Sequence, residues 1–258
     1  MKWRNRHLLV TAFSGWCAVA AHAQLPAAAE FAVLSYPAKG NIHLDEGTLD
    51  LWVISDFDTD RKKLSASGED LRRANLFDLV FPEEQWHYVL SFIPWADAFA
   101  MVGYAVPQQR YVWAGPPHWK PGEAHHVVLT WSGRKRSLFC DGQWEWKGGK
   151  GPYSSRDVEV EGGFIGDFTN ARIEIGRGGF VTIDEVQIRR TALTREEIVN
   201  AKDAPLVADV NTLLLDHCDG GPPEIIGGQT GETAGTLSGT YQIVAGKFGK
   251  ATRLWKAK

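Results

Sequence analysis

The chain is dominated by short runs of β-branched, aromatic and alternating apolar residues, each bounded by Gly, Pro, Asp or Asn. Such runs favour extended backbone, and the residues between them favour turns. Many short strands separated by turns are typical of an all-β sandwich or barrel. The ten predicted strands are 48–54, 76–81, 86–93, 99–106, 111–113, 125–131, 137–140, 172–175, 181–189 and 212–217.

One short helix is predicted near the end of this β-rich pattern. Thr194 is a suitable N-cap, and Glu196 and Glu197 follow in the first turn. Lys202 and Pro205 end the segment, so the helix has about two turns. A helix of this size is expected to cover one face or edge of a sheet.

The N-terminal segment has the pattern of a cleaved secretory signal. Basic residues at positions 2, 4 and 6 precede the uncharged apolar stretch 8–21, and Ala21-His22-Ala23 gives the small-x-small cleavage pattern. The stretch is too short to span a bilayer comfortably. The sequence therefore predicts a signal peptide over 1–23, a folded part over 24–258, and a periplasmic or extracellular location without membrane insertion.

The net charge of the exported chain bears on which kinds of partner it can bind. Removing 1–23 takes away three basic residues and no acidic one, which moves the formal net charge from −3 to −6. A mildly acidic chain without basic runs argues against nucleic acid as a partner.

Cys140 and Cys218 remain after removal of the signal peptide, and the oxidising compartment would permit a disulfide between them. Buried free thiols are the alternative, because both residues lie in apolar runs.

Four further segments occur in a recognisable order: 47–53 (GTLDLWV), 119–131 (WKPGEAHHVVLTW), 138–142 (LFCDG) and 183–188 (IDEVQI), the last followed by 192–198. Together they resemble the laminin-G-like domain of the concanavalin-A-like lectin and glucanase superfamily. The resemblance implies a two-sheet antiparallel jelly-roll sandwich with one short C-terminal helix. Ala124 departs from the pattern, because the family usually has Trp there, and this suggests local repacking.

The C-terminal segment 206–258 resembles the part that normally opens such a domain. Residues 212–220 and 246–251 carry this likeness, and in the usual order they would run into a segment like 34–41. Two arrangements follow: a circularly permuted sandwich that 206–258 closes, or one sandwich followed by the stub of a second repeat. We favour closure, because natural sheets avoid unpaired edges and chain termini lie close together in such folds. Pairing between neighbouring chains is a third arrangement.

The sequence contains no recognisable catalytic set. Glucanases of this superfamily carry Glu-x-Asp-x-x-Glu on one strand, and no predicted strand here has it. Asp184 and Glu185 are adjacent and should point to opposite faces, and the resemblance makes the pair structural. The histidines lack a nucleophile motif or metal-ligand spacing. The chain is therefore predicted not to be an enzyme.

Alternating acidic residues raise one metal hypothesis. Asp56, Asp58 and Asp60 could supply oxygen ligands to calcium. The run is not an EF-hand, since Arg61 stands where Gly is needed, and a solvated acidic loop is the competing interpretation. No other cofactor is predicted.

Aromatic residues supply the candidate ligand site. Trp144 and Trp146 lie two apart after the Asp141-Gly142 turn, which would place them on one side of a strand. Trp95, Trp113 and Tyr153 lie near Pro- and Gly-rich turns. Aromatic rings stack on sugars, although they also fill sandwich cores.

These features favour an exported, non-catalytic module that binds a glycan through exposed aromatic residues. The second hypothesis is a protein–protein adhesion or structural domain whose partner is an extracellular protein. A glycoside hydrolase with an atypical site is the third. The assignment through the superfamily is an analogy, because this fold hosts all three functions.

Overall fold

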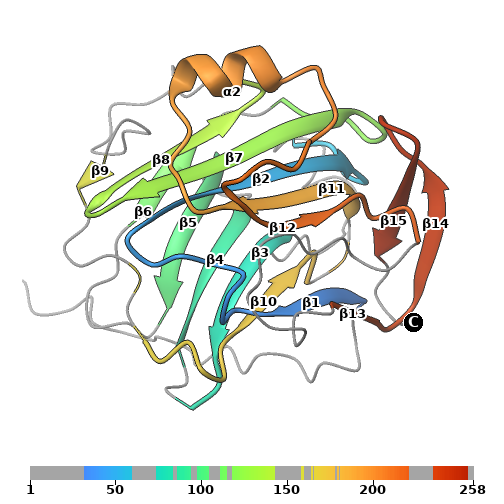
Figure 1. Cartoon of the computed structure of the whole chain (residues 1–258). Helices are drawn as coiled ribbons and strands as arrows, with labels where there is room; N and C mark the ends of the chain where they lie inside the picture. The colour runs from blue at the N-terminus through green and yellow to red at the C-terminus, as the bar shows by residue number, and fades with distance from the viewer. Residues whose placement is uncertain are drawn as a thin grey trace, which may run out of the picture.

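The computed structural model describes residues 32–59, 74–83, 86–93, 98–104, 111–114, 118–142, 158–159, 164, 166–177, 179, 181–220 and 235–254. Their strands form two antiparallel sheets that face each other, and helix α2 (Arg195–Ala201) lies above them (Figure 1). The predicted all-β sandwich of two antiparallel sheets with one short helix is confirmed for this part of the chain.

The first sheet has seven strands in the order β13, β1, β10, β3, β4, β5 and β6. Their bounds are Thr236–Ser238, Val33–Pro37, Arg172–Ile175, Asn75–Phe81, Trp86–Ile93, Ala98–Tyr104 and Tyr111–Ala114, in that order.

The second sheet has eight strands in the order β14, β15, β11, β2, β7, β8 and β9, with β12 paired to β11 beside this path. Their bounds are Tyr241–Ala245, Lys250–Leu254, Val181–Arg189, Glu46–Ser55, Ala124–Ser132, Lys135–Cys140 and Val158–Glu159, and β12 spans Thr212–Asp216.

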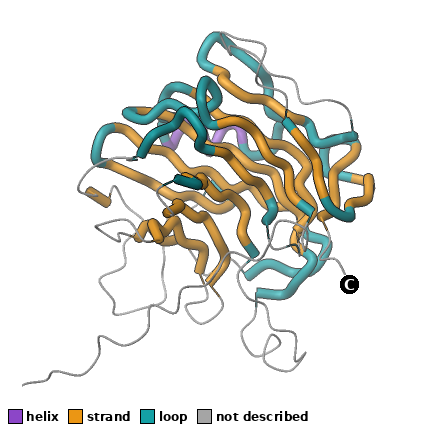
Figure 2. The backbone as a smooth tube through the Cα atoms, turned by 90° about the horizontal axis from the view of Figure 1, so that it is seen from below, coloured by secondary structure: helices purple, strands orange, loops and turns teal. Residues whose placement is uncertain are grey.

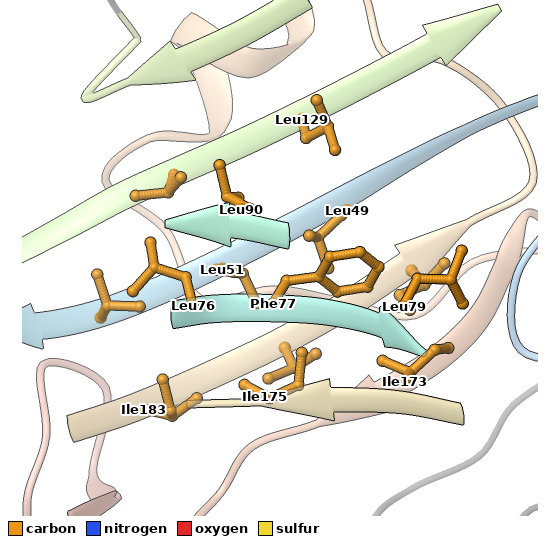
Figure 3. Packing of buried hydrophobic residues seen from close by; sticks show 14 of the residues in the cluster. Leu49, Leu51, Leu76, Phe77, Leu79, Leu90, Leu129, Ile173, Ile175 and Ile183 are labelled. Carbon is orange, nitrogen blue, oxygen red and sulfur yellow. The ribbon is translucent and has the colours of Figure 1, made fainter. Parts of the chain in front are cut away.

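The core lies between the sheets and follows from the alternation of side chains along each strand. On β2, Leu49 and Leu51 point into the core, whereas Asp50 and Trp52 belong to the outer face. On β3, Leu79 packs in the same core (Figure 3). Here the outer face of a sheet means the face turned away from the other sheet.

Helix α2 covers the outer face of the eight-stranded sheet. Thr194 caps it, accepting from the backbone NH of Glu197 while the Glu197 carboxylate accepts from the backbone NH of Thr194. Ile198 packs on Val128 of β7 and Phe139 of β8. The capped two-turn helix and its covering role are as the sequence predicts.

The C-terminal strands pair with both sheets. Strands β15 and β12 pair with successive halves of one edge of β11, and β13 pairs with β1 in the other sheet. The carboxylate of Asp184 accepts from the backbone NH groups of Lys247 and Phe248, which holds the β14–β15 turn against β11. Residues 206–254, where described, are thus part of this sandwich.

No helix of the described residues is long and apolar enough to cross a membrane.

Candidate functional site

Most of the predicted aromatic site lies outside the described residues. This holds for Trp95, Trp144, Trp146 and Tyr153. Trp113 lies on β6, where its backbone pairs with Ala100 of β5, but its side chain is outside the described set. The platform predicted at Trp144 and Trp146 therefore stays a prediction.

The acidic loop after β2 is described only in part. The Arg253 guanidinium binds Asp56 through both oxygens, with Nε–Oδ2 and Nη2–Oδ1 distances of 3.1 Å and 3.0 Å. Burial raises the pKa of Asp56, and Arg253 lowers it in part. Asp60 lies outside the described residues, which contain no group of three or more His, Cys, Asp or Glu suited to a metal. Calcium binding by Asp56, Asp58 and Asp60 stays a prediction.

The predicted disulfide between Cys140 and Cys218 is wrong. Both residues are free thiols, and burial raises the pKa of each. The strand order explains this, because β8, which ends at Cys140, is separated from β12 by β7, β2 and β11. Four strand spacings amount to about 19 Å, whereas disulfide Cα atoms lie about 4.4–6.8 Å apart. The alternative of two buried thiols is what the structure shows.

A group of polar side chains lies on the outer face of the seven-stranded sheet. The core contacts of Phe77 and Leu79 place the intervening Asp78 on that face. Ser91 and Glu174 lie on the same face for the same reason, between core residues of β4 and β10. Together with Asn75 and Arg177, these residues are called the outer-face cluster. Figure 2 views the molecule from the side opposite to α2.

Strand register brings the members of the outer-face cluster together. Asp78 is the Cα partner of Glu174 on β10, and Asn75 is the partner of Ser91 on β4. A β-bulge between Asn75 and Phe77 adds a residue to β3, so both Asn75 and Asp78 reach this face. The Asn75 amide donates to the Asp78 carboxylate, with N–O distances of 3.1 Å and 3.4 Å.

The two carboxyl groups have different surroundings. Glu174 forms an ion pair of 2.8 Å with Arg177 and a longer contact of 3.7 Å with Arg172. Asp78 is fully buried, and no guanidinium or ammonium of the described chain lies within ion-pair distance of it. Burial raises the pKa of Asp78 to about 7, and the Glu174 charge adds to this effect, while Arg177 and the Asn75 amide oppose it.

The cluster has hydrogen-bonding capacity that the described residues do not fill. Ser91 Oγ and Asn75 Oδ1 are buried, and neither has a hydrogen-bond partner in the described part of the chain. Buried polar atoms are almost always paired, since an unmet hydrogen bond costs about 1–3 kcal/mol. An unpaired hydroxyl beside an unpaired amide oxygen marks a place where a ligand or water can bind.

A buried apolar group adjoins the polar cluster. Ile93, Ala98, Ala100 and Val102 form a separate buried group on the outer faces of β4 and β5. The ladder continues from Asn75 through Ser91 and Ala100 to Trp113, one residue on each of β3, β4, β5 and β6. This row spans three strand spacings, about 14 Å. Trp113 is therefore the one predicted aromatic residue that the structure places in register with the cluster.

The eight-stranded sheet also carries polar groups on its outer face, and several of them pair within the fold, although His126 Nδ1 and Trp52 Nε1 are buried without a hydrogen-bond partner in the described part of the chain. His126 Nε2 lies 2.6 Å from Asp50 Oδ1, and its ring stacks on Trp52. The Lys247 ammonium lies over the same indole, 3.5 Å from the Trp52 ring centroid. Leu206 and Phe248 pack on Trp52 as well, so the C-terminal segment covers this part of the face.

Glu185 holds the same segment. Its carboxylate accepts from the backbone NH of Leu206 at 2.5 Å and lies 2.9 Å from His217 Nδ1. Asp184 binds backbone amides of the same segment, so Asp184 and Glu185 both have the structural role that the resemblance implies. The sequence predicted that Asp184 and Glu185 point to opposite faces of their strand, and this is not what the structure shows. A bulge in β11 between Ile183 and Glu185 lets both carboxylates reach the C-terminal segment.

The sequence did contain a signal for the outer-face cluster. Asp78 and Glu174 are charged residues inside the predicted strands 76–81 and 172–175, at positions between core residues. A charge at a buried strand position requires a partner or a function. What the sequence does not reveal is that β3 and β10 are neighbours in the sheet.

Comparison with known proteins adds information on the fold. No protein-family model matches the chain. No curated protein matches it either. Among solved structures, a candidate carbohydrate-binding protein from Bacteroides ovatus shares 14% identity at a TM-score of 0.50, and the match covers 88% of this chain and 60% of that one.

Two other solved structures match less of the chain. Domain 4 of AbnA, a GH43 extracellular arabinanase from Geobacillus stearothermophilus solved with arabinotriose, gives 14% identity, a TM-score of 0.42, and coverage of 62% and 68%. The Trypanosoma rangeli sialidase gives 20% identity, a TM-score of 0.40, and coverage of 61% and 22%. The class that the fold defines is a two-sheet antiparallel β-sandwich. At these identities the comparisons reach no further than the fold, and the chain spans about 60% of the length of the Bacteroides ovatus structure.

Proposed function

We propose that this chain is a carbohydrate-binding module with a laminin-G-like sandwich, and that it binds a glycan on the outer face of the seven-stranded sheet. The observation that carries the proposal is the outer-face cluster, where Ser91 Oγ and Asn75 Oδ1 lack partners among the described residues. The carbohydrate-binding description of the Bacteroides ovatus protein agrees with this proposal.

The chemistry of the face suits a sugar. Sugar rings carry hydroxyl groups that need hydrogen-bond partners and apolar faces that need apolar contact. The outer-face cluster has a hydroxyl, an amide and a carboxyl group, and the small side chains of the buried Ala98 and Ala100 lie beside it. We propose that Trp113, at the end of the same row, supplies the stacking ring.

Access to the cluster has a kinetic consequence. Asp78 and Ser91 have no surface exposed to solvent, so a ligand contacts them only after a local opening of the structure. Association that requires a conformational change is slower than the usual range of roughly 10⁵–10⁷ M⁻¹s⁻¹. Stopped-flow measurement of Trp fluorescence should therefore show a rate that levels off at high glycan concentration.

The module is proposed to act outside the cytoplasm. The predicted signal peptide over 1–23 would direct export and leave Gln24 as the first residue. Mass spectrometry of the protein recovered from its native host tests this directly. An intact N-terminus in the recovered protein would contradict export by cleavage.

The binding test is a polysaccharide retardation and glycan-array screen on residues 24–258, with and without calcium. Retardation by a defined glycan that Ser91→Ala and Trp113→Ala abolish, with folding unchanged, supports the proposed site. Ser132→Ala is the matched control, because Ser132 is exposed on β7 of the other sheet. Loss of binding in Trp144→Ala alone would place the site at the predicted Trp144 and Trp146 platform instead.

Hydrolysis is the second candidate function, because two carboxyl groups face each other on neighbouring strands and one has a pKa of about 7. Retaining glycosidases use a carboxyl pair of this kind at a separation of about 5–5.5 Å. We propose binding without catalysis, since Glu174 is already engaged by Arg172 and Arg177. Release of reducing ends from a bound glycan, abolished in Asp78→Asn, would favour the enzyme. Capture of a protein and no glycan would favour adhesion.

A further inference from the structure

We propose that two copies of this chain pair edge to edge through β14, on the side of the sandwich that β13 and β14 form. These are end strands of the seven-stranded and eight-stranded sheets, and only residues 239 and 240 separate them. Residues 236–245 are called the edge segment. Figure 1 shows β14 at the outer margin of its sheet, beside β15. This surface is separate from the outer-face cluster, so the pairing does not depend on glycan binding.

The edge segment is accessible to a partner. None of its ten residues is buried, and seven of them are exposed. Tyr241 is 48% exposed, and it is the one exposed large hydrophobic residue that lies on a strand in the described part of the chain. A partner can therefore reach this surface without any rearrangement of the fold.

The free edge of β14 lacks the features that usually keep sheets from joining. Natural edge strands are very short, or carry charges, proline or a bulge. The end strand on the opposite side of the same sheet, β9, has two residues, one of them Glu159. In contrast, β14 has five residues without charge or proline, and it pairs with β15 in continuous register. Its outward backbone groups have no paired strand in the described part of the chain.

The residues of β14 suit a second copy of the same strand. A two-fold axis places identical strands side by side and antiparallel. With the axis at Ile243, Tyr241 lies opposite Ala245 of the second copy. Gln242 then lies opposite Val244 of the second copy. Large side chains thus meet smaller ones and no like charges meet, while the eight-stranded sheet continues from one copy into the other.

The pairing is expected to be weak and reversible. A standard interface buries about 800 Å² on each partner, and a strand of five residues, about 17 Å long, buries less than this. We therefore expect a dissociation constant on the order of 10 µM. Such a dimer forms at high local concentration and separates on dilution.

Sedimentation velocity of the chain without its predicted signal peptide (residues 24–258), from about 1 µM to about 500 µM, tests the pairing. The unmodified protein should pass from monomer to dimer. The double variant Gln242→Lys, Val244→Lys places lysine opposite lysine twice and should weaken the dimer by about tenfold or more. The double variant Gln242→Lys, Val244→Glu is the matched control, because it places lysine opposite glutamate and should keep the dimer. Urea unfolding checks that both variants remain folded.

A cross-link locates the two-fold axis. Opposed residues of an antiparallel pair have Cα atoms about 4.5–5.5 Å apart, within the disulfide range of about 4.4–6.8 Å. Ile243→Cys should therefore give a disulfide-linked dimer on mild oxidation. Tyr241→Cys should not, because its two copies lie more than about 13 Å apart along the strands. The native thiols, Cys140 and Cys218, are buried.

Each result decides the matter. A chain that stays monomeric up to about 500 µM overturns the proposal, and an extended peptide that binds this monomer would make another protein the occupant of the edge. A dimer that both double variants weaken equally, or that neither weakens, overturns pairing through β14. A cross-link in Tyr241→Cys and none in Ile243→Cys overturns the axis at Ile243.

Discussion

The stability of the Asp78→Asn variant relative to the unmodified protein should rise with pH. Asp78 is fully buried, and its pKa of about 7 in the folded chain compares with an ordinary value of 3.8. A carboxyl group with a raised pKa holds its proton more tightly in the folded state than in the unfolded state. Its stabilising contribution is therefore complete below pH 3.8 and is lost as the pH rises through 7.

The size of the loss follows from the two pKa values. Each pKa unit corresponds to about 1.4 kcal/mol, so the free energy of unfolding falls by about 1.7 kcal/mol at pH 5 and by about 4 kcal/mol at pH 8, relative to low pH. The amide introduced by Asp78→Asn does not titrate, so the variant lacks this loss. The difference between the two proteins should therefore grow by roughly 2.5 kcal/mol from pH 5 to pH 8.

Urea unfolding at pH 5, 6, 7 and 8 measures this difference. Any constant cost of placing an amide beside Asn75 shifts all four values equally, so the slope alone carries the result. Asp203→Asn, which removes a surface carboxyl, controls for the general effect of net charge. A difference between Asp78→Asn and the unmodified protein that stays constant with pH, or that falls, would refute a buried Asp78 with a raised pKa.

Three further predictions concern stability and reactivity. Tyr36→Phe removes the 2.6 Å hydrogen bond from the buried Tyr36 hydroxyl to Asp216 Oδ2, and should lower the free energy of unfolding in urea by about 1–3 kcal/mol, with a cost near zero contradicting this role. Thr194→Ala removes the N-cap of α2 and should cost about 1 kcal/mol in the same assay, whereas Thr194→Ser should restore most of it. Cys140 and Cys218, buried with raised pKa values, should resist iodoacetamide until denaturant is added. Rapid labelling of either thiol in native buffer would count against its burial.

Local patterns in the sequence predicted most of the fold. All ten predicted strands are present as β2 to β8 and β10 to β12, because each carries a strong alternation or apolar run between turn residues. Strands β1, β9 and β13 to β15 were missed. Strand β1 ends at Pro37, which cannot donate a ladder hydrogen bond. The short run 241–245 (YQIVA) forms the edge strand β14, which buries little surface.

The candidate site was less predictable for a related reason. Asp78 and Glu174 each stand out as charges within a strand, but only the antiparallel pairing of β3 with β10 makes them neighbours. The bulge that brings Asn75 and Asp78 to one face depends on tertiary context as well. The aromatic residues were easy to notice in the sequence, yet only Trp113 falls in register with the cluster in the described part of the chain.

The way the last strands complete the sheets has a consequence for how the chain folds. Val33 pairs with Ser238, and Val181 pairs with Leu254, so β1 and part of β11 gain these partners only after nearly all of the described chain is available. Pairings of such high sequence separation raise the contact order, and all-β chains of high contact order fold in milliseconds to seconds. During synthesis, one edge of β11 has no partner until β12 and the strands after it have left the ribosome. A nascent chain of this kind stays incompletely folded for most of its synthesis, and a stop codon placed just before β12 should yield an aggregation-prone fragment, because it leaves that edge open.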